Sequence, residues 1–274
     1  MTKKQAISQI AEEVTKEIIA SLEGGVAPWV KPWNTGTSYS FPINGSTLKA
    51  YNGINWISLI LTAGKRGFSS NQWFTFKQAK AAGGAVVKGS KGTKILFCQP
   101  ITIEDEETEE ERTYIKGRCY TVFAREQIEG LPEAETYEHV TDDVIEGFIK
   151  NTSAKVEIGG GRAYYSPKDD YIRLPKLSAF KNRNEYYATA IHELVHWSGG
   201  EKRLNRDCSN YAFEELVAEL GAAFLCSRFQ INGNLQHTSY IKSWIQHLNE
   251  DYTFITQAAS QAQKAVNYLL ETKH

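Results

Sequence analysis

Apolar residues recur every three to four positions in several stretches of this chain, a spacing that predicts amphipathic helices. These stretches span about 7–22, 140–151, 186–199, 210–229 and, as one or two helices, 239–270. Short runs rich in β-branched and aromatic residues predict strands. These runs lie at 94–103, 113–123, 156–158, 162–165 and 170–174. The mixture predicts the α+β fold class.

The segment 128–139 interrupts these patterns. It contains Gly130, Pro132 and several glutamates, a composition typical of a linker. The length of 274 residues allows two ordinary domains. We therefore expect a first domain at 1–130 and a second at 140–274.

The charge of the chain is divided unevenly between its first third and the rest. Residues 1–98 carry a net charge of +8, from 12 Lys and Arg against 4 Glu, whereas the remainder carries −9, from 19 against 28. A basic first part indicates a polyanionic partner. Apolar runs are too short to span a bilayer, and four scattered cysteines fit a reducing compartment, so we expect a cytoplasmic protein with no membrane partner.

Aromatic, amide and cationic residues interleave in the basic part, as a single-stranded nucleic acid site requires: rings stack on unpaired bases and cations follow phosphates. The candidate DNA-binding residues are Trp29, Lys31, Trp33, Tyr51, Asn52, Asn55, Trp56, Trp73, Thr75, Lys77, Gln78, Lys88, Lys91 and Lys94. The alternative is that the tryptophans form the core and the lysines a solvated face.

The stretch 186–199 contains His192, Glu193 and His196 in an H-E-x-x-H arrangement. Residues four apart lie on one face of a helix, so the two imidazoles can bind one metal ion. Glu193 lies beside them as general base for the attacking water. The alternative is a helix that carries two histidines by chance.

A two-histidine site needs at least one further protein ligand, and the helix at 210–229 offers carboxylates on an apolar face. We assign Glu215, 19 residues after His196, as the third ligand, and Glu219 as the carboxylate that orients a ligand histidine. Two alternatives remain open: Glu215 and Glu219 could exchange these roles, or the glutamates of this helix could serve only in salt bridges or helix capping. Glu214 is turned about 100° away and is expected at the surface.

This ligand set predicts Zn²⁺, although the ligands alone do not exclude Mn²⁺ or Fe²⁺. Two strands precede the H-E-x-x-H helix, which is the order found in zincins, where an edge strand can pair with an extended peptide. Tyr164, Tyr165 and Tyr186 are candidates for stabilising an oxyanion. The residues thus point to a metal-dependent peptidase.

Ordered strings along nearly the whole chain resemble the ArdC-type antirestriction proteins of plasmids and phages. They are Pro28-Trp29-x-Lys31-Pro32-Trp33, Tyr51-Asn52-Gly53-Ile54-Asn55, Trp73-x-Thr75-x-x-Gln78, Val87-Lys88-Gly89-x-Lys91, His192-Glu193-x-x-His196-Trp197 and Glu214-Glu215-Leu216-x-Ala218-Glu219-Leu220. The second part is also similar, more distantly, to SprT/Spartan proteases, which use a third histidine where we assign Glu215.

The ArdC resemblance implies an N-terminal single-stranded-DNA-binding domain and a C-terminal zincin-like metallopeptidase domain. It also implies that the protein protects incoming mobile DNA from host restriction, and that it could be transferred with that DNA. The expected partners are single-stranded DNA and an unidentified protein substrate, which could itself be DNA-bound. The alternative is a protective DNA-binding protein whose metal is structural and whose proteolysis is irrelevant.

Overall fold

The computed structural model describes residues 3–25, 27–29, 41–104, 111–133, 140–233 and 240–271, with only the backbone described at 3–10, 98–104 and 111–116. Two of the candidate DNA-binding residues, Lys31 and Trp33, lie outside the described residues. Within them, no helix is long and apolar enough to cross a membrane.

The described part of the chain combines helices and strands, as the α+β prediction requires. The helices are α1 (Lys3–Glu23), α2 (Ile54–Arg66), α3 (Phe76–Ala81), α4 (Asp142–Asn151), α5 (Arg183–Ser198), α6 (Tyr211–Arg228), α7 (Ile241–Glu250) and α8 (Thr253–Glu271). The strands are β1 (Ile43–Asn44), β2 (Gln72–Thr75), β3 (Ala85–Val86), β4 (Thr93–Glu104), β5 (Glu111–Ala124), β6 (Ile128–Glu129), β7 (Val156–Ile158), β8 (Tyr164–Ser166) and β9 (Tyr171–Leu174).

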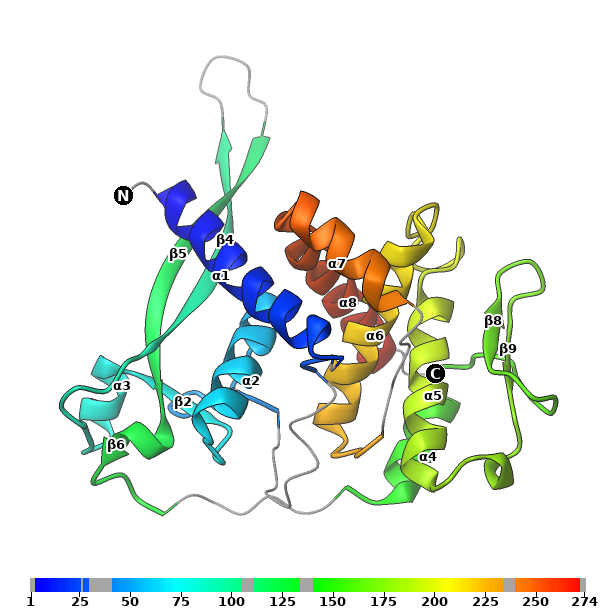
Figure 1. Cartoon of the computed structure of the whole chain (residues 1–274), viewed down its shortest axis with the longest axis horizontal. Helices are drawn as coiled ribbons and strands as arrows, with labels where there is room; N and C mark the ends of the chain where they lie inside the picture. Colours follow the sequence, from blue (N-terminus) through cyan, green and yellow to red (C-terminus); the bar gives the residue numbers. More distant parts are fainter. Residues whose placement is uncertain are drawn as a thin grey trace.

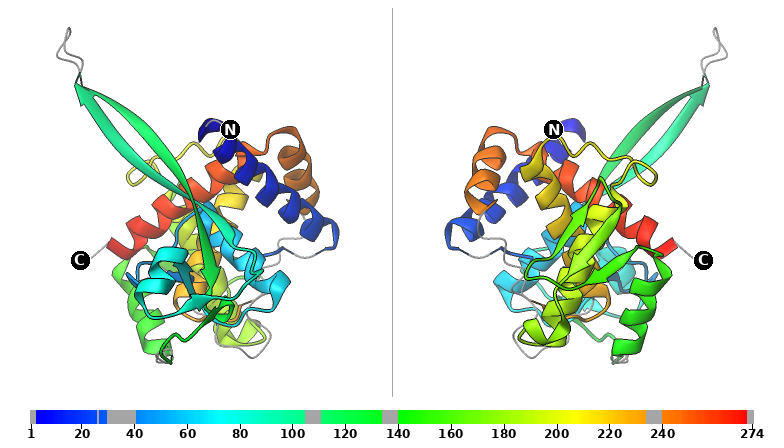
Figure 2. Two further views of the ribbon diagram at one scale, coloured as in Figure 1. Left: turned by 90° about the vertical axis from the view of Figure 1, so that its left-hand side faces the viewer. Right: turned by 90° about the vertical axis from the view of Figure 1, so that its right-hand side faces the viewer.

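The N-terminal half is built on a four-stranded sheet in the order β1-β2-β5-β4. Strands β4 and β5 form a long antiparallel hairpin in which Phe97 pairs with Arg118. The hairpin rises away from the body of the molecule (Figures 1 and 2). Helix α2 covers its base, where Leu59 and Ala63 pack with Ile95.

The C-terminal half is mainly helical, with a small sheet in the order β7-β9-β8 at one side (Figure 1). Helices α5 and α6 pack closely because α6 has Gly221 at the contact. A Cβ atom at that position would lie 2.9 Å from the methyl groups of Val195 on α5. This close approach sets the spacing between the two helices that carry the candidate metal ligands.

The largest cluster of buried side chains joins the two halves rather than stopping at the predicted domain boundary. The ring of Trp56 on α2 lies 4.8 Å from that of Phe224 on α6, and the ring of Trp29 lies 6.1 Å from that of Trp244 on α7. The Thr15 hydroxyl on α1 donates to the Tyr252 carbonyl. Helix α6 is therefore braced by the N-terminal half.

The helices at 7–22, 186–199 and 210–229 and the three short strands before α5 are confirmed within a few residues. The hairpin predicted at 94–103 and 113–123 is also confirmed, as β4 and β5. Helices α2 and α3 were missed, because their residues were interpreted mainly as a DNA-facing surface. Thr141 lies at the N-cap of α4, but its side chain makes no capping bond there.

Candidate metal centre

Helix α5 holds His192, Glu193 and His196 in place from a well-defined start. The Asn182 side chain at its N-cap accepts a hydrogen bond from the backbone N–H of Glu185, satisfying one of the free donors of the first turn. His192 is 2% exposed and Glu193 7% exposed, so both are held by packing. The two imidazoles face the same way, one turn apart, as the sequence spacing predicts.

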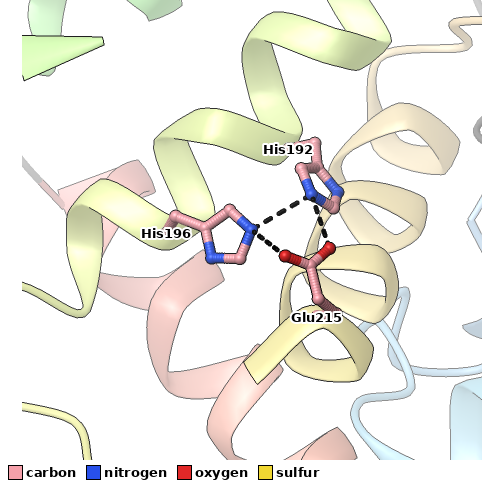
Figure 3. Close-up of side chains that lie close together, drawn as sticks. All are labelled: His192, His196 and Glu215. Atoms are coloured by element: carbon pink, nitrogen blue, oxygen red, sulfur yellow. Dashed lines mark hydrogen bonds and ion pairs between the residues drawn. The ribbon is translucent and has the colours of Figure 1, made fainter. Parts of the chain in front are cut away.

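Helix α6 brings Glu215 to these imidazoles (Figure 3). Its carboxylate oxygens lie 3.6 Å from His192 Nε2 and 3.5 Å from His196 Nε2, and the two Nε2 atoms are 3.1 Å apart. Ligand atoms about 2.1 Å from a tetrahedrally coordinated ion stand roughly 3.4 Å from one another. The donor set therefore fits a divalent metal ion without rearrangement.

Glu214 orients His196 from the side opposite to Glu215. Its Oε1 lies 2.9 Å from Nδ1 of His196, and its two oxygens accept hydrogen bonds of 2.6 and 2.7 Å from Arg206. A proton on Nδ1 leaves the lone pair of Nε2 free for a metal. The expectation of Glu214 at the surface is wrong, since Glu214 is only 4% exposed. A surface position was inferred from one helix alone, whereas the loop carrying Arg206 covers this face.

Charge at the centre is balanced by these contacts. Burial raises the pKa of Glu214, but the Arg206 and His196 bonds outweigh it and bring the pKa down to about 2. Burial lowers the pKa of His196, but the bond and charge of Glu214 outweigh it and the pKa is raised. Burial also raises the pKa of Glu215, and the two histidines again reverse this effect, so the pKa lies below its usual value.

Two glycines after α5 make room for the arginines that brace this centre. A Cβ on Gly199 would lie 2.6 Å from Arg206 Nη2, and one on Gly200 would lie 2.2 Å from Arg203 Nη2. Arg206 also donates to the Val195 carbonyl at 2.9 Å. The absence of side chains at these two positions thus leaves space for both guanidinium groups beside the end of α5.

Glu219 lies one helical turn beyond Glu215 and is 1% exposed. Among the described residues that could jointly hold a metal ion, the structure brings together His192, His196 and Glu215. This grouping agrees with our choice of Glu215 over Glu219 as the third ligand. That Glu219 orients a ligand histidine stays a prediction.

The centre opens into a cleft of about 800 Å³ between α5, α6 and β8. Tyr164 and Tyr165, two of the three tyrosines predicted from sequence, line it, whereas Tyr186 is not among its lining residues. Tyr211 and Tyr240 also line it and were missed. The Tyr240 hydroxyl donates to that of Tyr211 at 3.1 Å. Tyr211 could have been found from sequence, since it lies four residues before Glu215 on one helix face.

Strand β8 is an edge strand of its sheet, and its Tyr164 and Tyr165 line the cleft. The Tyr165 hydroxyl donates to Asp170 at 3.0 Å, and Arg203 bonds to both residues. Because Arg203 also stacks over Trp197 at 4.0 Å, it ties the β8–β9 hairpin to the end of α5. The edge strand is thereby held beside the metal ligands, where an extended peptide could pair with it.

The three described tryptophans among the candidate DNA-binding residues are not on the surface. Trp29 is 1% exposed, Trp56 0% and Trp73 1%. The prediction that they stack on bases is therefore wrong for this structure, and the core alternative is the one observed. Trp56 lies on helix α2, which the sequence interpretation missed, and its ring faces α6 rather than solvent.

Three polar candidates make bonds within the fold. Asn55 accepts from the Leu96 backbone N–H at 2.7 Å and donates to the Leu96 carbonyl at 2.6 Å. Thr75 and Gln78 form the capping box of α3. These side chains hold backbone in place, so their predicted DNA contacts would need those bonds to break.

The remaining described candidates leave open a nucleic acid surface in the N-terminal half. Tyr51 is half-buried and receives a bond from the Asn44 amide at 3.2 Å. The other five are exposed: Asn52, Lys77, Lys88, Lys91 and Lys94. Lys94 forms a loose ion pair with Glu13 at 3.8 Å. Contact of these exposed candidates with DNA stays a prediction.

The fold and the candidate metal centre are of the kind found in zincin-like domains. Residues 143–261 match the family described as zincin-like metallopeptidase, and residues 8–123 match the N-terminal domain of the anti-restriction factor ArdC. The structure is similar to crystal structures of the antirestriction ArdC protein from plasmid R388. In its metal-free form that protein is 40% identical, with a TM-score of 0.81 and coverage of 96% of this chain and 97% of that one. The chain therefore belongs to the ArdC-type antirestriction family.

Other relatives differ in length. The chain is 32% identical to the uncharacterized protein y4eC of Sinorhizobium fredii, over 97% of this chain and 92% of that protein. It is 38% identical to the DNA primase TraC of Escherichia coli over 94% of this chain, but spans only 27% of TraC. The Mn(II)-bound form of the R388 protein is also similar, with a TM-score of 0.78 and 39% identity.

Proposed function

We propose that this chain binds single-stranded DNA of a mobile element and hydrolyses peptide bonds at a metal centre, and that it thereby protects incoming DNA from host restriction. The observation that carries the peptidase part is the convergence of His192, His196 and Glu215 beside Glu193 in an open cleft. A metal with only a structural role would not require Glu193, which is no part of the ligand set.

The ligands proposed for the metal are His192, His196 and Glu215, and Zn²⁺ is the ion that such a set favours. The Mn(II)-bound relative keeps Mn²⁺ as an alternative. Once bound, the cation would polarise the scissile carbonyl and acidify the attacking water. All other contributions come from residues of this chain.

Glu193 takes the proton from the attacking water and returns it to the leaving amine. The Glu193 side chain is suited to this role because it lines the cleft, is only 7% exposed, and is fixed in position by α5. Strand β8 positions the peptide by backbone pairing, and the Tyr211 hydroxyl in the cleft, which accepts from Tyr240, donates to the developing oxyanion. Glu214 keeps the proton of His196 on Nδ1, so that Nε2 stays available.

The DNA-binding part is supported by the net charge of +8 on residues 1–98 and by the match of residues 8–123 to the ArdC N-terminal domain. Exposed Lys88 and Lys91 precede β4 and can contact phosphates. Affinity should fall as salt rises, because phosphate contacts release counterions. A protein substrate met on single-stranded DNA and a cytoplasmic location both remain part of the proposal.

The decisive experiment compares the wild type with Glu193→Gln, which keeps shape and the metal ligands. We expect Glu193→Gln to retain one metal per chain and unchanged DNA affinity, and to lose protection of plasmid DNA transferred into a restricting recipient. Glu201→Gln, a change at an exposed glutamate on the rim of the same cleft, is the matched control and should protect normally. Full protection by Glu193→Gln would show that proteolysis is irrelevant to this role and would favour a purely DNA-binding protein.

A further inference from the structure

The burial of the tryptophans leaves open which rings in the N-terminal half could stack on bases. Within the part of this half whose side chains are described, the exposed large aromatic residues are Phe76, Phe97 and Tyr120. Phe97 on β4 is 51% exposed and Tyr120 on β5 is 40% exposed. Isolated exposed rings are ordinary, but these two form a pair, with ring centroids 6.2 Å apart and planes at 81°.

The strand register places this pair on one face of the hairpin. Phe97 lies opposite Arg118, and Ile95 lies opposite Tyr120, so Phe97, Tyr120 and the exposed Arg118 all point to the same side. Ile95 on that side packs with Leu59 and Ala63 of α2, whereas Leu96, next to Phe97, is bonded by Asn55 in the first turn of this helix. The pair thus lies beyond the part of the hairpin that α2 covers.

The backbone beneath the rings is held rigidly. Strand β4 is at the edge of its sheet, and the Asn55 amide on α2 satisfies both the N–H and the carbonyl of Leu96, next to Phe97. This bonding closes the edge of β4 to pairing with another strand at this point. Next to Phe97, the surface that the hairpin offers to a partner is therefore its face, where the rings and Arg118 are.

We propose that Phe97, Tyr120 and Arg118 form a single-stranded-DNA platform, the rings stacking on unpaired bases and Arg118 contacting a phosphate. This assignment rests on the proposed DNA-binding function and locates it in the chain. Charge complementarity favours DNA as the occupant, since the platform itself carries the exposed Arg118, residues 1–98 have a net charge of +8, and exposed Lys88 and Lys91 lie at the turn before β4. Stacking requires bases with free faces, so single strands are preferred over duplexes.

The test measures binding of a fluorescein-labelled oligo(dT) and of a labelled duplex to the full chain by anisotropy. We expect Phe97→Ala and Tyr120→Ala each to weaken oligo(dT) binding at least about fivefold, as loss of a stacked base does. Phe97→Trp keeps an aromatic ring at this position and should bind oligo(dT) as tightly as the wild type. Phe76→Ala is the matched control, because Phe76 is 61% exposed but lies on α3, at the base of the sheet, and it should stay within twofold (Figure 1).

Salt dependence separates the roles of the ring pair and the arginine. Arg118→Gln should reduce the slope of log affinity against log salt by about 0.7, the value for one phosphate contact on a single strand, while Phe97→Ala should leave the slope unchanged. A second measurement avoids relying on variants: ultraviolet crosslinking of wild type to oligo(5-iodo-deoxyuridine) should give adducts on the peptide that contains Phe97 or Tyr120.

Several results would overturn the platform. If wild type binds oligo(dT) and both alanine variants bind equally well, the site is elsewhere and the DNA-binding function stands. If wild type does not bind oligo(dT), the proposed DNA-binding function fails and the platform with it. If wild type sediments as a dimer that Phe97→Ala dissociates, with DNA affinity unchanged, the rings dock a second copy of the chain instead.

Discussion

Glu214 Oε1 lies 2.9 Å from Nδ1 of His196, on the side of the imidazole away from Glu215. Neighbouring glutamates on α6 therefore act on opposite nitrogens of one ring: Glu215 faces the metal position, and Glu214 fixes the tautomer. The two buried carboxylates can lie side by side because the buried guanidinium of Arg206 donates two hydrogen bonds to Glu214 and neutralises its charge. Without that guanidinium, two buried carboxylates at adjacent positions would be very costly.

Glu214→Gln should weaken Zn²⁺ binding by about 10- to 100-fold, the usual effect of losing a partner that orients a ligand histidine. The amide still fills the space but withdraws the negative charge from His196 Nδ1 and from Arg206. Affinity is measured by competition with a chromogenic chelator. Glu201→Gln serves as control, and an unchanged affinity for Glu214→Gln would remove the role assigned to the His196 contact.

The third ligand can be tested by exchanging the two candidates. Glu215→Ala should abolish stoichiometric metal binding, because two imidazoles alone hold Zn²⁺ weakly, whereas Glu219→Ala should bind one ion per chain with reduced affinity. Metal content after gel filtration, measured by mass spectrometry, distinguishes them. The reverse outcome would mean that the roles of Glu215 and Glu219 are exchanged.

The geometry of the candidate metal centre was largely predictable because its signal is local. The four-residue spacing of His192 and His196 is enough to set their geometry, and α6 follows a clear apolar period. Glu214 was misplaced because its partner, Arg206, comes from a loop whose path no helical period encodes. The tryptophans were misplaced for a related reason: Trp56 faces Phe224, 168 positions away, and one sequence cannot show which distant surface covers a ring.

Trp56→Ala should destabilise the whole chain by about 3–5 kcal/mol, the usual cost of deleting a fully buried large aromatic side chain. Because the ring packs on α6, we expect the variant and the wild type each to unfold in a single transition that involves both halves. Denaturant unfolding followed by circular dichroism checks this, with fluorescence of the remaining tryptophans as a second probe. Leu48→Ala, at a residue 62% exposed, should change stability by less than about 0.5 kcal/mol. Two separate transitions, with only the first shifted by Trp56→Ala, would contradict a shared core.

The contact of Asp170 with Arg203 predicts a pH-dependent contribution to stability. The Arg203 bond is the largest influence on the carboxyl and outweighs burial, so the pKa of Asp170 lies below its usual 3.8. A carboxyl with a depressed pKa stabilises the fold above its unfolded pKa, and this contribution is lost as the pH falls through the folded value. At neutral pH, Asp170→Asn should cost about 1–3 kcal/mol, because it withdraws the charged partner of a buried guanidinium.

The difference in unfolding free energy between wild type and Asp170→Asn should therefore be constant from neutral pH down to about one unit above 3.8 and shrink below it. Urea unfolding of the metal-free proteins at a series of pH values measures it. Asp169→Asn, at the neighbouring carboxyl, is the control, since Asp169 is exposed and bonds the Ser166 hydroxyl rather than Arg203. A difference that persists unchanged well below pH 3.8 would show that charge on Asp170 is not what holds Arg203, and that the β8–β9 hairpin is tied to α5 by the stacking of Arg203 on Trp197 instead.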